Sequence, residues 1–171
     1  MNLIVDIGNS RAKIAIVDNG EIREQYAVPN ITDMDIRNIV TRYPALSRAI
    51  VASTRGNAES VGALLRHYIP NVVVFTPATT PIPLGNLYHT PQTLGADRLA
   101  AAVGVAALYP NRDIMIVDFG TAITIDYVVN GAFCGGNISP GVTTRFRALA
   151  DYTATLPLCS PTESVLEYGR T

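Results

Sequence analysis

Two segments of this chain repeat each other, and the repeat limits the possible folds more than any other feature. Residues 3–17 read LIVDIGNSRAKIAIV, and residues 115–129 read MIVDFGTAITIDYVV. In each segment an apolar run, an Asp-x-Gly turn and a second apolar run lead to an Asn-Gly pair, which is a strong hairpin signal. The chain therefore contains two related units, each beginning with a strand, a tight turn and two further strands.

Helices and strands alternate after the first hairpin. We expect strands near 2–7, 11–17, 21–27, 49–53 and 72–75, helices near 33–43, 57–68 and 96–108, and an irregular Pro- and Thr-rich loop over 76–91. This alternation predicts an α/β fold with a mixed sheet. We place the two units at 1–113 and 114–171. The second has room only for its hairpin and a helix near 141–150, so we expect it to be incomplete and the chain to be part of a longer protein.

Composition excludes several classes of function. Apolar residues make up 48% of the 171 residues, which is enough for a core, and the net charge of -1 with scattered basic residues argues against nucleic-acid binding. Cys134 and Cys159 match neither a zinc pattern nor a disulfide framework, so we expect two buried thiols in a reducing compartment. No signal peptide is apparent, and the apolar stretch 99–109 is too short to cross a bilayer. We therefore expect a cytoplasmic protein without membrane contact.

The first Asp-x-Gly turn carries a candidate phosphate site, although no Walker A loop or GxGxxG motif occurs. Gly8 lets the backbone approach a bulky anion, and Asn9, Ser10 and free backbone amides can donate to phosphate oxygens. Lys13 adds a positive charge. Asp6, at the end of the first strand, would hold Mg²⁺ directly or through water.

The second turn, DFGTAIT (118–124), offers one carboxylate and the hydroxyl groups of Thr121 and Thr124. A single Asp-x-Gly turn is usually structural, but two copies in corresponding positions favour phosphate binding. We interpret Asp126, further along the same strand, as a solvated strand-end residue.

The segment LGADR (94–98) opens the helix at 96–108, and its charges have two interpretations. Asp97 is either a first-turn carboxylate that favours the positive helix end or a general base on a substrate hydroxyl. Arg98 is either solvated or a fork for an anionic group such as a carboxylate.

Three other features have simpler structural explanations. Tyr88 is interpreted as a packing residue, and His67 and His89 as ordinary histidines. The segment GGNISPG (135–141) is either a bend at a strand end or a loop that contacts a ligand.

Together these motifs resemble the type III pantothenate kinases of the acetate kinase, sugar kinase and actin superfamily. The matching segments are DIGNSRAK (6–13), Tyr88 with Pro91, GADR (95–98), IVDFGTAITID (116–126) and GGNISPG (135–141). The resemblance implies ribonuclease H-like units in tandem. It also implies ATP-dependent phosphorylation of pantothenate to 4′-phosphopantothenate, the first step towards coenzyme A.

The resemblance also assigns roles to residues. It implies ATP contacts from Asp6, Ile7, Gly8, Asn9, Ser10, Arg11, Ala12 and Lys13, with Thr121 from the other side. The pantothenate pocket would be lined by Tyr88, Gly95, Ala96, Asp97 and Arg98, with Asp97 as proton acceptor. Asp118 would hold a monovalent cation, K⁺ or NH₄⁺, beside the Mg²⁺ that accompanies ATP. The family is homodimeric, and a threonine from the partner subunit falls at or just beyond Thr171.

Two alternatives stay open at this point. The first alternative to a pantothenate kinase is a catalytically inactive accessory or regulatory relative with the same fold. The second is a kinase of this superfamily that acts on another small hydroxyl compound, such as a sugar.

Overall fold

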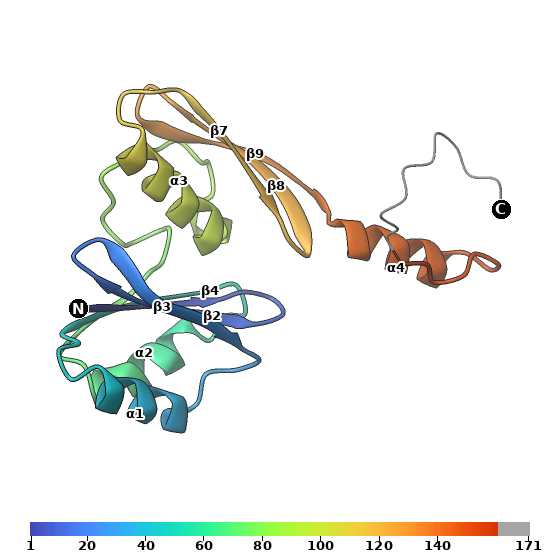
Figure 1. Cartoon of the computed structure of the whole chain (residues 1–171). Helices are drawn as coiled ribbons and strands as arrows, with labels where there is room; N and C mark the ends of the chain where they lie inside the picture. Colours follow the sequence, from blue (N-terminus) through green and yellow to red (C-terminus); the bar gives the residue numbers. More distant parts are fainter. Residues whose placement is uncertain (161–171) are drawn as a thin grey trace.

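The computed structural model describes residues 1–160 and contains two β-sheets with packed helices (Figure 1). The strands are β1 (Asn2–Ile7), β2 (Ala12–Asp18), β3 (Glu21–Val28), β4 (Arg48–Ser53), β5 (Asn71–Val74), β6 (Gly85–Asn86), β7 (Ile114–Phe119), β8 (Ala122–Val129) and β9 (Ala132–Pro140). The helices are α1 (Asp33–Arg42), α2 (Ala58–Arg66), α3 (Ala96–Leu108) and α4 (Val142–Tyr152), with a short 3₁₀ turn, η1 (Pro91–Thr93). Within residues 1–160 no helix has the length and apolar character needed to cross a bilayer.

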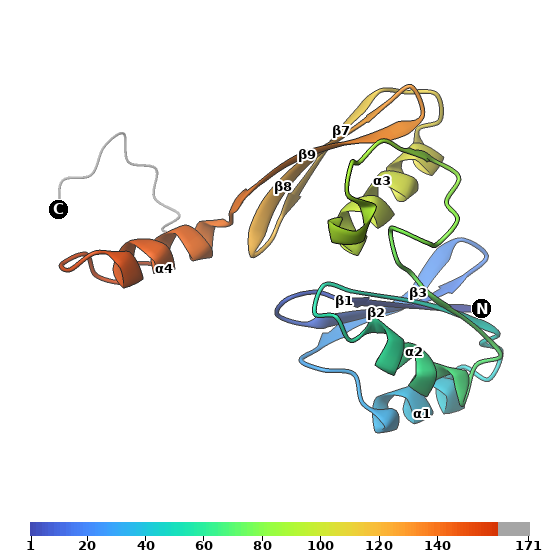
Figure 2. The same ribbon diagram turned by 180° about the vertical axis from the view of Figure 1, so that it is seen from behind.

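The first sheet has the strand order β3-β2-β1-β4-β5. Its first three strands are antiparallel, and β4 and β5 run parallel to β1, as expected for a ribonuclease H-like unit. Leu3, Val5 and Ile7 of β1 are at most 2% exposed and belong to the core between this sheet and helices α1 and α2, which cover one face (Figures 1 and 2). Because side chains alternate along a strand, Ile4 and Asp6 are directed to the opposite face.

The second sheet has the order β6-β9-β8-β7 and begins by repeating the first. β7, β8 and β9 form an antiparallel meander, as β1, β2 and β3 do. Both predicted Asn-Gly turns are present with positive φ, at 50° and 84° for Asn19-Gly20 and 50° and 72° for Asn130-Gly131. Helix α3 packs on this sheet through Leu99 and Ala102, which share a core with Phe133. The predicted α/β fold with mixed sheets is therefore confirmed.

The predicted loop over 76–91 contains one element that the sequence did not indicate. Gly85 and Asn86 form β6, which pairs in parallel with the start of β9. The amide of Leu87 also donates to the Phe133 carbonyl at 2.9 Å. These two residues carry no apolar pattern, so only the pairing reveals the strand. The boundary at 113/114 stays a prediction, since β6 and α3 precede it and both contact the second sheet.

The expectation of two buried thiols is wrong, because Cys134 and Cys159 are both exposed. Cys134 follows the fully buried Phe133 on β9, so the alternation of the strand turns it outward. Cys159 follows α4 in a segment where every residue is exposed.

Two glycine-to-alanine substitutions should change stability in opposite directions. A Cβ on Gly136 would collide with the Ile125 carbonyl and lie 2.7 Å from the Cα of Asp126, so the β8–β9 pairing would have to open. Gly136→Ala should lower the free energy of unfolding by about 1–3 kcal/mol. Gly104→Ala, in α3 with open space around the new Cβ, should raise it by about 0.5–1 kcal/mol. Urea denaturation measures both, and a neutral Gly136→Ala would contradict the packing described above.

Candidate functional site

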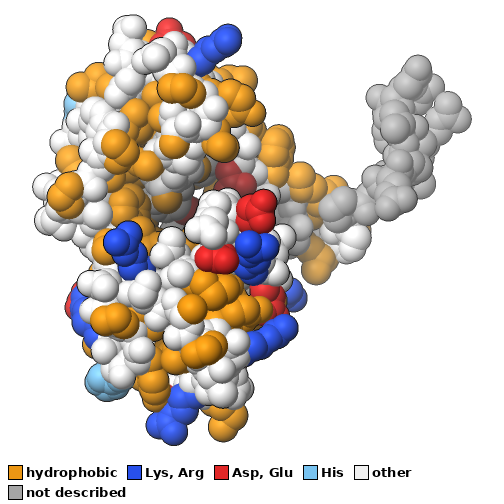
Figure 3. Space-filling model, turned by 60° about the vertical axis from the view of Figure 1, so that its left-hand side comes forward, with side chains coloured by type: hydrophobic (Ala, Val, Ile, Leu, Met, Phe, Trp, Pro, Cys, Tyr) orange, Lys and Arg blue, Asp and Glu red, His pale blue; other side chains and the backbone are white. Residues whose placement is uncertain are grey.

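A cleft of about 620 Å³ lies between the uncovered face of the first sheet, helix α3 and strand β7. Its apolar lining includes Ile4, Ile50 and Phe75. Its charged lining comes from three separate sequence motifs and consists of Asp6, Lys13, Asp97 and Asp118. Figure 3 shows the hollow where the two halves of the molecule meet, with charged side chains at its margin. An apolar cleft with a few converging charges is the usual form of a small-molecule site.

The first hairpin presents a closed turn at the cleft. The Gly8 amide donates to the Arg11 carbonyl at 3.0 Å, which leaves Asn9 and Ser10 exposed at the tip. Asp6 and Lys13 lie opposite each other on β1 and β2, and Lys13 Nζ is 3.5 Å from Asp6 Oδ2. Both side chains are accessible, so this ion pair is weak and can open for a ligand.

The second hairpin has a turn one residue shorter, also closed by a glycine amide, and it meets the first. The Gly120 amide donates to the Ala122 carbonyl at 2.9 Å. The hydroxyls of Ser10 and Thr121 lie 3.5 Å apart, so the two predicted phosphate turns face each other. Together with α4 they line a neighbouring hollow of about 580 Å³.

The glycine-rich segment 135–141 supports the second turn. Gly141 precedes α4 and donates its amide to the Thr121 carbonyl at 2.9 Å, and Thr144 Oγ1 donates to the same oxygen at 2.7 Å. A Cβ on Gly141 would collide with the Gly120 carbonyl. The glycine is therefore required for close packing against the turn, a reason that neither sequence interpretation contained.

Arg55, in the loop after β4, supports the first turn, and no sequence motif pointed to it. Its Nε donates to the Gly8 carbonyl at 2.7 Å, and Nη1 donates to the Pro29 carbonyl and to Asn30 Oδ1. All three acceptors are neutral, and within residues 1–160 Arg55 forms no ion pair. A fixed and uncompensated positive charge therefore lies directly behind the first turn.

The start of α3 places Asp97 at the cleft. Gly95 is the N-cap, and Asp97 Oδ1 accepts a hydrogen bond from the Arg98 amide at 2.9 Å. Asp97 is exposed and lines the cleft, so it is both a first-turn carboxylate and available to a ligand. The two interpretations from the sequence are compatible.

Arg98 and Asp126 form a buried ion pair, which corrects the sequence interpretation of Asp126. Asp126 is 1% exposed rather than solvated, because this side of β8 is covered by α3. Arg98 Nε lies 3.1 and 3.0 Å from the two carboxylate oxygens, and Nη2 lies 2.5 Å from Oδ1. These hydrogen bonds raise the pKa of Arg98 above its usual value.

Several other predicted site residues do not line the cleft itself. Ile7 and Ala12 are buried in the first core and can contribute only their backbone, whereas Arg11 is exposed. Gly95 and Ala96 line a separate hollow on the other side of the α3 N-terminus. Thr171, near the predicted partner-subunit threonine, lies outside the described residues.

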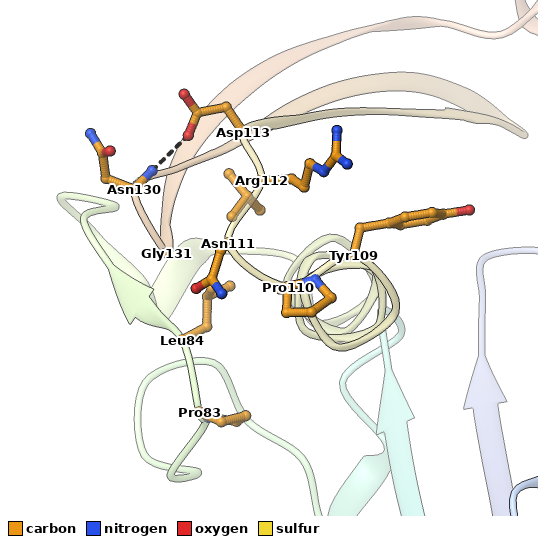
Figure 4. Close-up of a pocket in the computed structure, with 11 residues that line it drawn as sticks. Pro83, Leu84, Tyr109, Pro110, Asn111, Arg112, Asp113, Asn130 and Gly131 are labelled. Carbon is orange, nitrogen blue, oxygen red and sulfur yellow. Dashed lines mark hydrogen bonds between the residues drawn. The ribbon is translucent and has the colours of Figure 1, made fainter.

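Another pocket, of about 460 Å³, lies at the far end of α3 (Figure 4). There the Asn130 amide donates to Asp113 Oδ1 at 2.9 Å, which fixes the β8–β9 turn. With 13 residues, α3 is about 20 Å long and separates this pocket from Asp97. None of the predicted site residues lines it.

Comparison with known proteins identifies the family of this chain. Residues 2–170 match the family model of the type III pantothenate kinases. The chain belongs to this family. The predicted family is thus confirmed, and with it the family's reaction, the phosphorylation of pantothenate by ATP with Mg²⁺ in coenzyme A biosynthesis.

Three similar bacterial relatives are described as type III pantothenate kinases. Those from Phocaeicola vulgatus, Bacteroides fragilis and Porphyromonas gingivalis are 43, 41 and 40% identical to this chain. The alignments cover 99, 92 and 98% of this chain and 70, 65 and 69% of the relatives. The chain therefore spans about two thirds of the length of these kinases.

One solved structure supports the fold alone. It is a Campylobacter jejuni protein described as belonging to the Baf family, with a TM-score of 0.56 and 21% identity. The match covers 99% of this chain and 68% of that one.

The contacts of Arg55 predict a role in nucleotide affinity. Arg55→Gln should weaken ATP binding by about tenfold or more, because a hydrogen bond from a charged donor contributes about 1.5–3 kcal/mol. Arg66→Gln is a matched control, since Arg66 is exposed and pairs only with Glu59 among the described residues. Titration with a fluorescent ATP analogue measures both affinities, and equal affinities for the two variants would refute the role of Arg55.

Proposed function

We propose that the cleft between the first sheet, α3 and β7 is the active site in which this type III pantothenate kinase phosphorylates pantothenate. The observation that carries the proposal is the convergence of Asp6, Lys13, Asp97 and Asp118 on one cleft. Phosphoryl transfer depends mainly on positioning and on neutralising charge. The four side chains come from the three motifs that the sequence marked independently.

The ATP phosphates are proposed to lie between the two hairpin turns. Residues 6–13 approach them from one side and Thr121 from the other. The tips of the turns meet within 3.5 Å at Ser10 and Thr121, so donors of both turns lie close enough to reach one phosphate group. Turn amides and hydroxyls are suitable donors to phosphate oxygens. Lys13 and Arg55 supply positive charge from the side and from behind.

The cleft also provides carboxylates for the proposed cations. Within residues 1–160 there is no cluster of three metal-ligating side chains, which agrees with Mg²⁺ being bound mainly by ATP phosphates and water. Asp6 would complete the Mg²⁺ shell, and Asp118 would hold a monovalent cation, K⁺ or NH₄⁺. When bound, these ions neutralise negative charge on the phosphates.

Asp97 is proposed to act as the proton acceptor. Its carboxylate takes the proton from the pantothenate hydroxyl as that O–H bond breaks. The oxygen then forms a bond to the γ-phosphorus of ATP, the bond from this phosphorus to the bridging oxygen breaks, and ADP leaves. Tyr88 and Arg98 would form the pantothenate side of the site, together with Gly95 and Ala96 in the adjoining hollow, which shares Phe75 with the cleft.

Removing the carboxylate of Asp97 should affect turnover far more than nucleotide binding. Asp97→Asn should lower kcat by about 100-fold or more, as expected for a general base, while ATP affinity stays close to that of the wild type. Glu21→Gln is the matched control, because Glu21 is exposed, pairs with Arg23 and lines neither the cleft nor the hollow beside Gly95.

A coupled assay for ADP in the full-length protein measures both variants. Equal kcat values for Asp97→Asn and Glu21→Gln would show that Asp97 is not the base. Absence of turnover by the wild type with ATP, Mg²⁺ and K⁺ would instead favour a catalytically inactive relative. Family membership favours pantothenate over another hydroxyl substrate, and substrate competition in the same assay tests this choice.

The proposed monovalent-cation site gives a second kinetic prediction. Wild-type turnover should rise with K⁺ or NH₄⁺, and Asp118→Asn should lose most of this activation because the cation loses a charged ligand. Titration of K⁺ against a constant ionic strength measures the effect. An unchanged K⁺ response in Asp118→Asn would place the cation elsewhere.

We also propose that the protein is a cytoplasmic homodimer, as the family resemblance implies. Large apolar side chains are exposed on β9 and α4, among them Ile138, Leu149 and Tyr152, and supply surface for a subunit contact. Light scattering of the purified protein tests the dimer, and a monomer at micromolar concentration would contradict it. Cell fractionation tests the compartment.

A further inference from the structure

The Arg98–Asp126 pair differs from every other ion pair within residues 1–160. Its side chains are 6% and 2% exposed, whereas each side chain in the other six pairs is at least 26% exposed. Surface pairs contribute little, and a buried pair must offset the loss of hydration of both charges. A gain in folding stability therefore does not explain why this pair is buried, and a role in the reaction is the alternative explanation.

The pair connects the two parts of the proposed active site. Arg98 follows Asp97 in the first turn of α3, and its amide donates to the Asp97 carboxylate. Asp126 lies on β8, two residues after Thr124, which pairs with Asp118 of β7. The ion pair thus fixes the proposed proton acceptor relative to the proposed cation ligand, although the two lie on different elements.

Tyr88 extends this connection to the substrate segment. The Arg98 guanidinium lies 5.8 Å from the centre of the Tyr88 ring, which lies 6.1 Å from that of Phe133. Gly135, with φ of 91°, leaves room for the ring, since a Cβ there would be 3.1 Å from Tyr88 Cδ2. Arg98 is therefore held at its edge by a carboxylate and at its face by an aromatic ring.

We propose that Asp126 is a positioning residue for phosphoryl transfer, which holds Arg98 and through it aligns Asp97 with the second hairpin. The inference rests on the proposed function of the cleft. It also changes the expected role of Arg98, because Asp126 occupies Nε and one side of Nη2 and neutralises the charge. A substrate carboxylate can then reach Arg98 only from the Nη1 side. It would contact one end of a guanidinium that is already paired with Asp126.

Substitutions at position 126 separate positioning from simple packing. Asp126→Asn keeps the shape but removes the charge, and should lower kcat per folded molecule by about 10- to 100-fold, as expected for a displaced catalytic group. The KM for ATP should change by about twofold at most, because the ATP turns are untouched. Asp126→Glu keeps the charge and should retain more of kcat than Asp126→Asn, although its extra methylene packs worse.

Thermal denaturation of each variant gives the folded fraction by which activity is divided. A side chain that serves only packing would give the opposite order, with Asn equal to wild type and Glu worse, and that order would overturn the inference. Arg98→Lys combined with Asp126→Asn should be little worse in kcat than either single change, because the two residues act as a unit. Fully additive losses would contradict the coupling.

Three measurements keep this inference distinct from the proposed function and from loss of folding. Glu21→Gln, which removes a carboxylate from an exposed ion pair with Arg23, should keep wild-type kcat. Wild-type activity with an unaffected Asp126→Asn would overturn the positioning role alone, whereas an inactive wild type would overturn the proposed function. If Asp126→Asn does not fold, Arg98→Lys decides, because an ammonium cannot reproduce the bidentate contact with Asp126. Its kcat per folded molecule should fall by about tenfold or more, and unchanged kcat would overturn the inference.

Discussion

The buried contact between the Arg98 guanidinium and the Asp126 carboxylate is the interaction on which the arrangement of the site depends. Helix α3 has polar contacts with the second sheet mainly through this pair, since its remaining buried residues on that side, such as Leu99 and Ala102, are apolar. Apolar packing holds a helix on a sheet but specifies its rotation less sharply than a bidentate hydrogen bond does. The pair therefore sets where Asp97 points.

The two hairpins place glycine-closed turns on both sides of the proposed ligand site. Each turn is closed by a glycine amide, Gly8 in the first and Gly120 in the second, and the tips meet at Ser10 and Thr121. The units are not supported in the same way. Arg55 lies behind the first turn and has no carboxylate partner among residues 1–160, whereas the second turn is fixed by hydrogen bonds from Gly141 and Thr144. The first side of the cleft is thus the more electropositive.

The sequence predicted what depends on local pattern and missed what depends on contacts between distant residues. The internal repeat and the Asn-Gly turns predicted both meanders, and α3 was predicted with its observed bounds because its apolar run ends at Pro110. Asp126 was misjudged, since it lies inside β8 rather than at its end, and its burial depends on α3, whose Arg98 lies 28 residues earlier. Arg55 and β6 were missed for the same reason. Family resemblance supplied the roles of Asp97 and Asp118, which spacing alone left open.

Backbone hydrogen exchange, with and without Mg²⁺ and a non-hydrolysable ATP analogue, most directly tests whether the two turns bind one ligand. Amides that donate to phosphate oxygens are protected from exchange while the complex lasts. We predict slower exchange at residues 8–11 and 120–122 together, with little change at Tyr109, which lines the pocket at the far end of α3. Protection of only one turn, or of the Tyr109 pocket instead, would contradict a ligand held between the two turns.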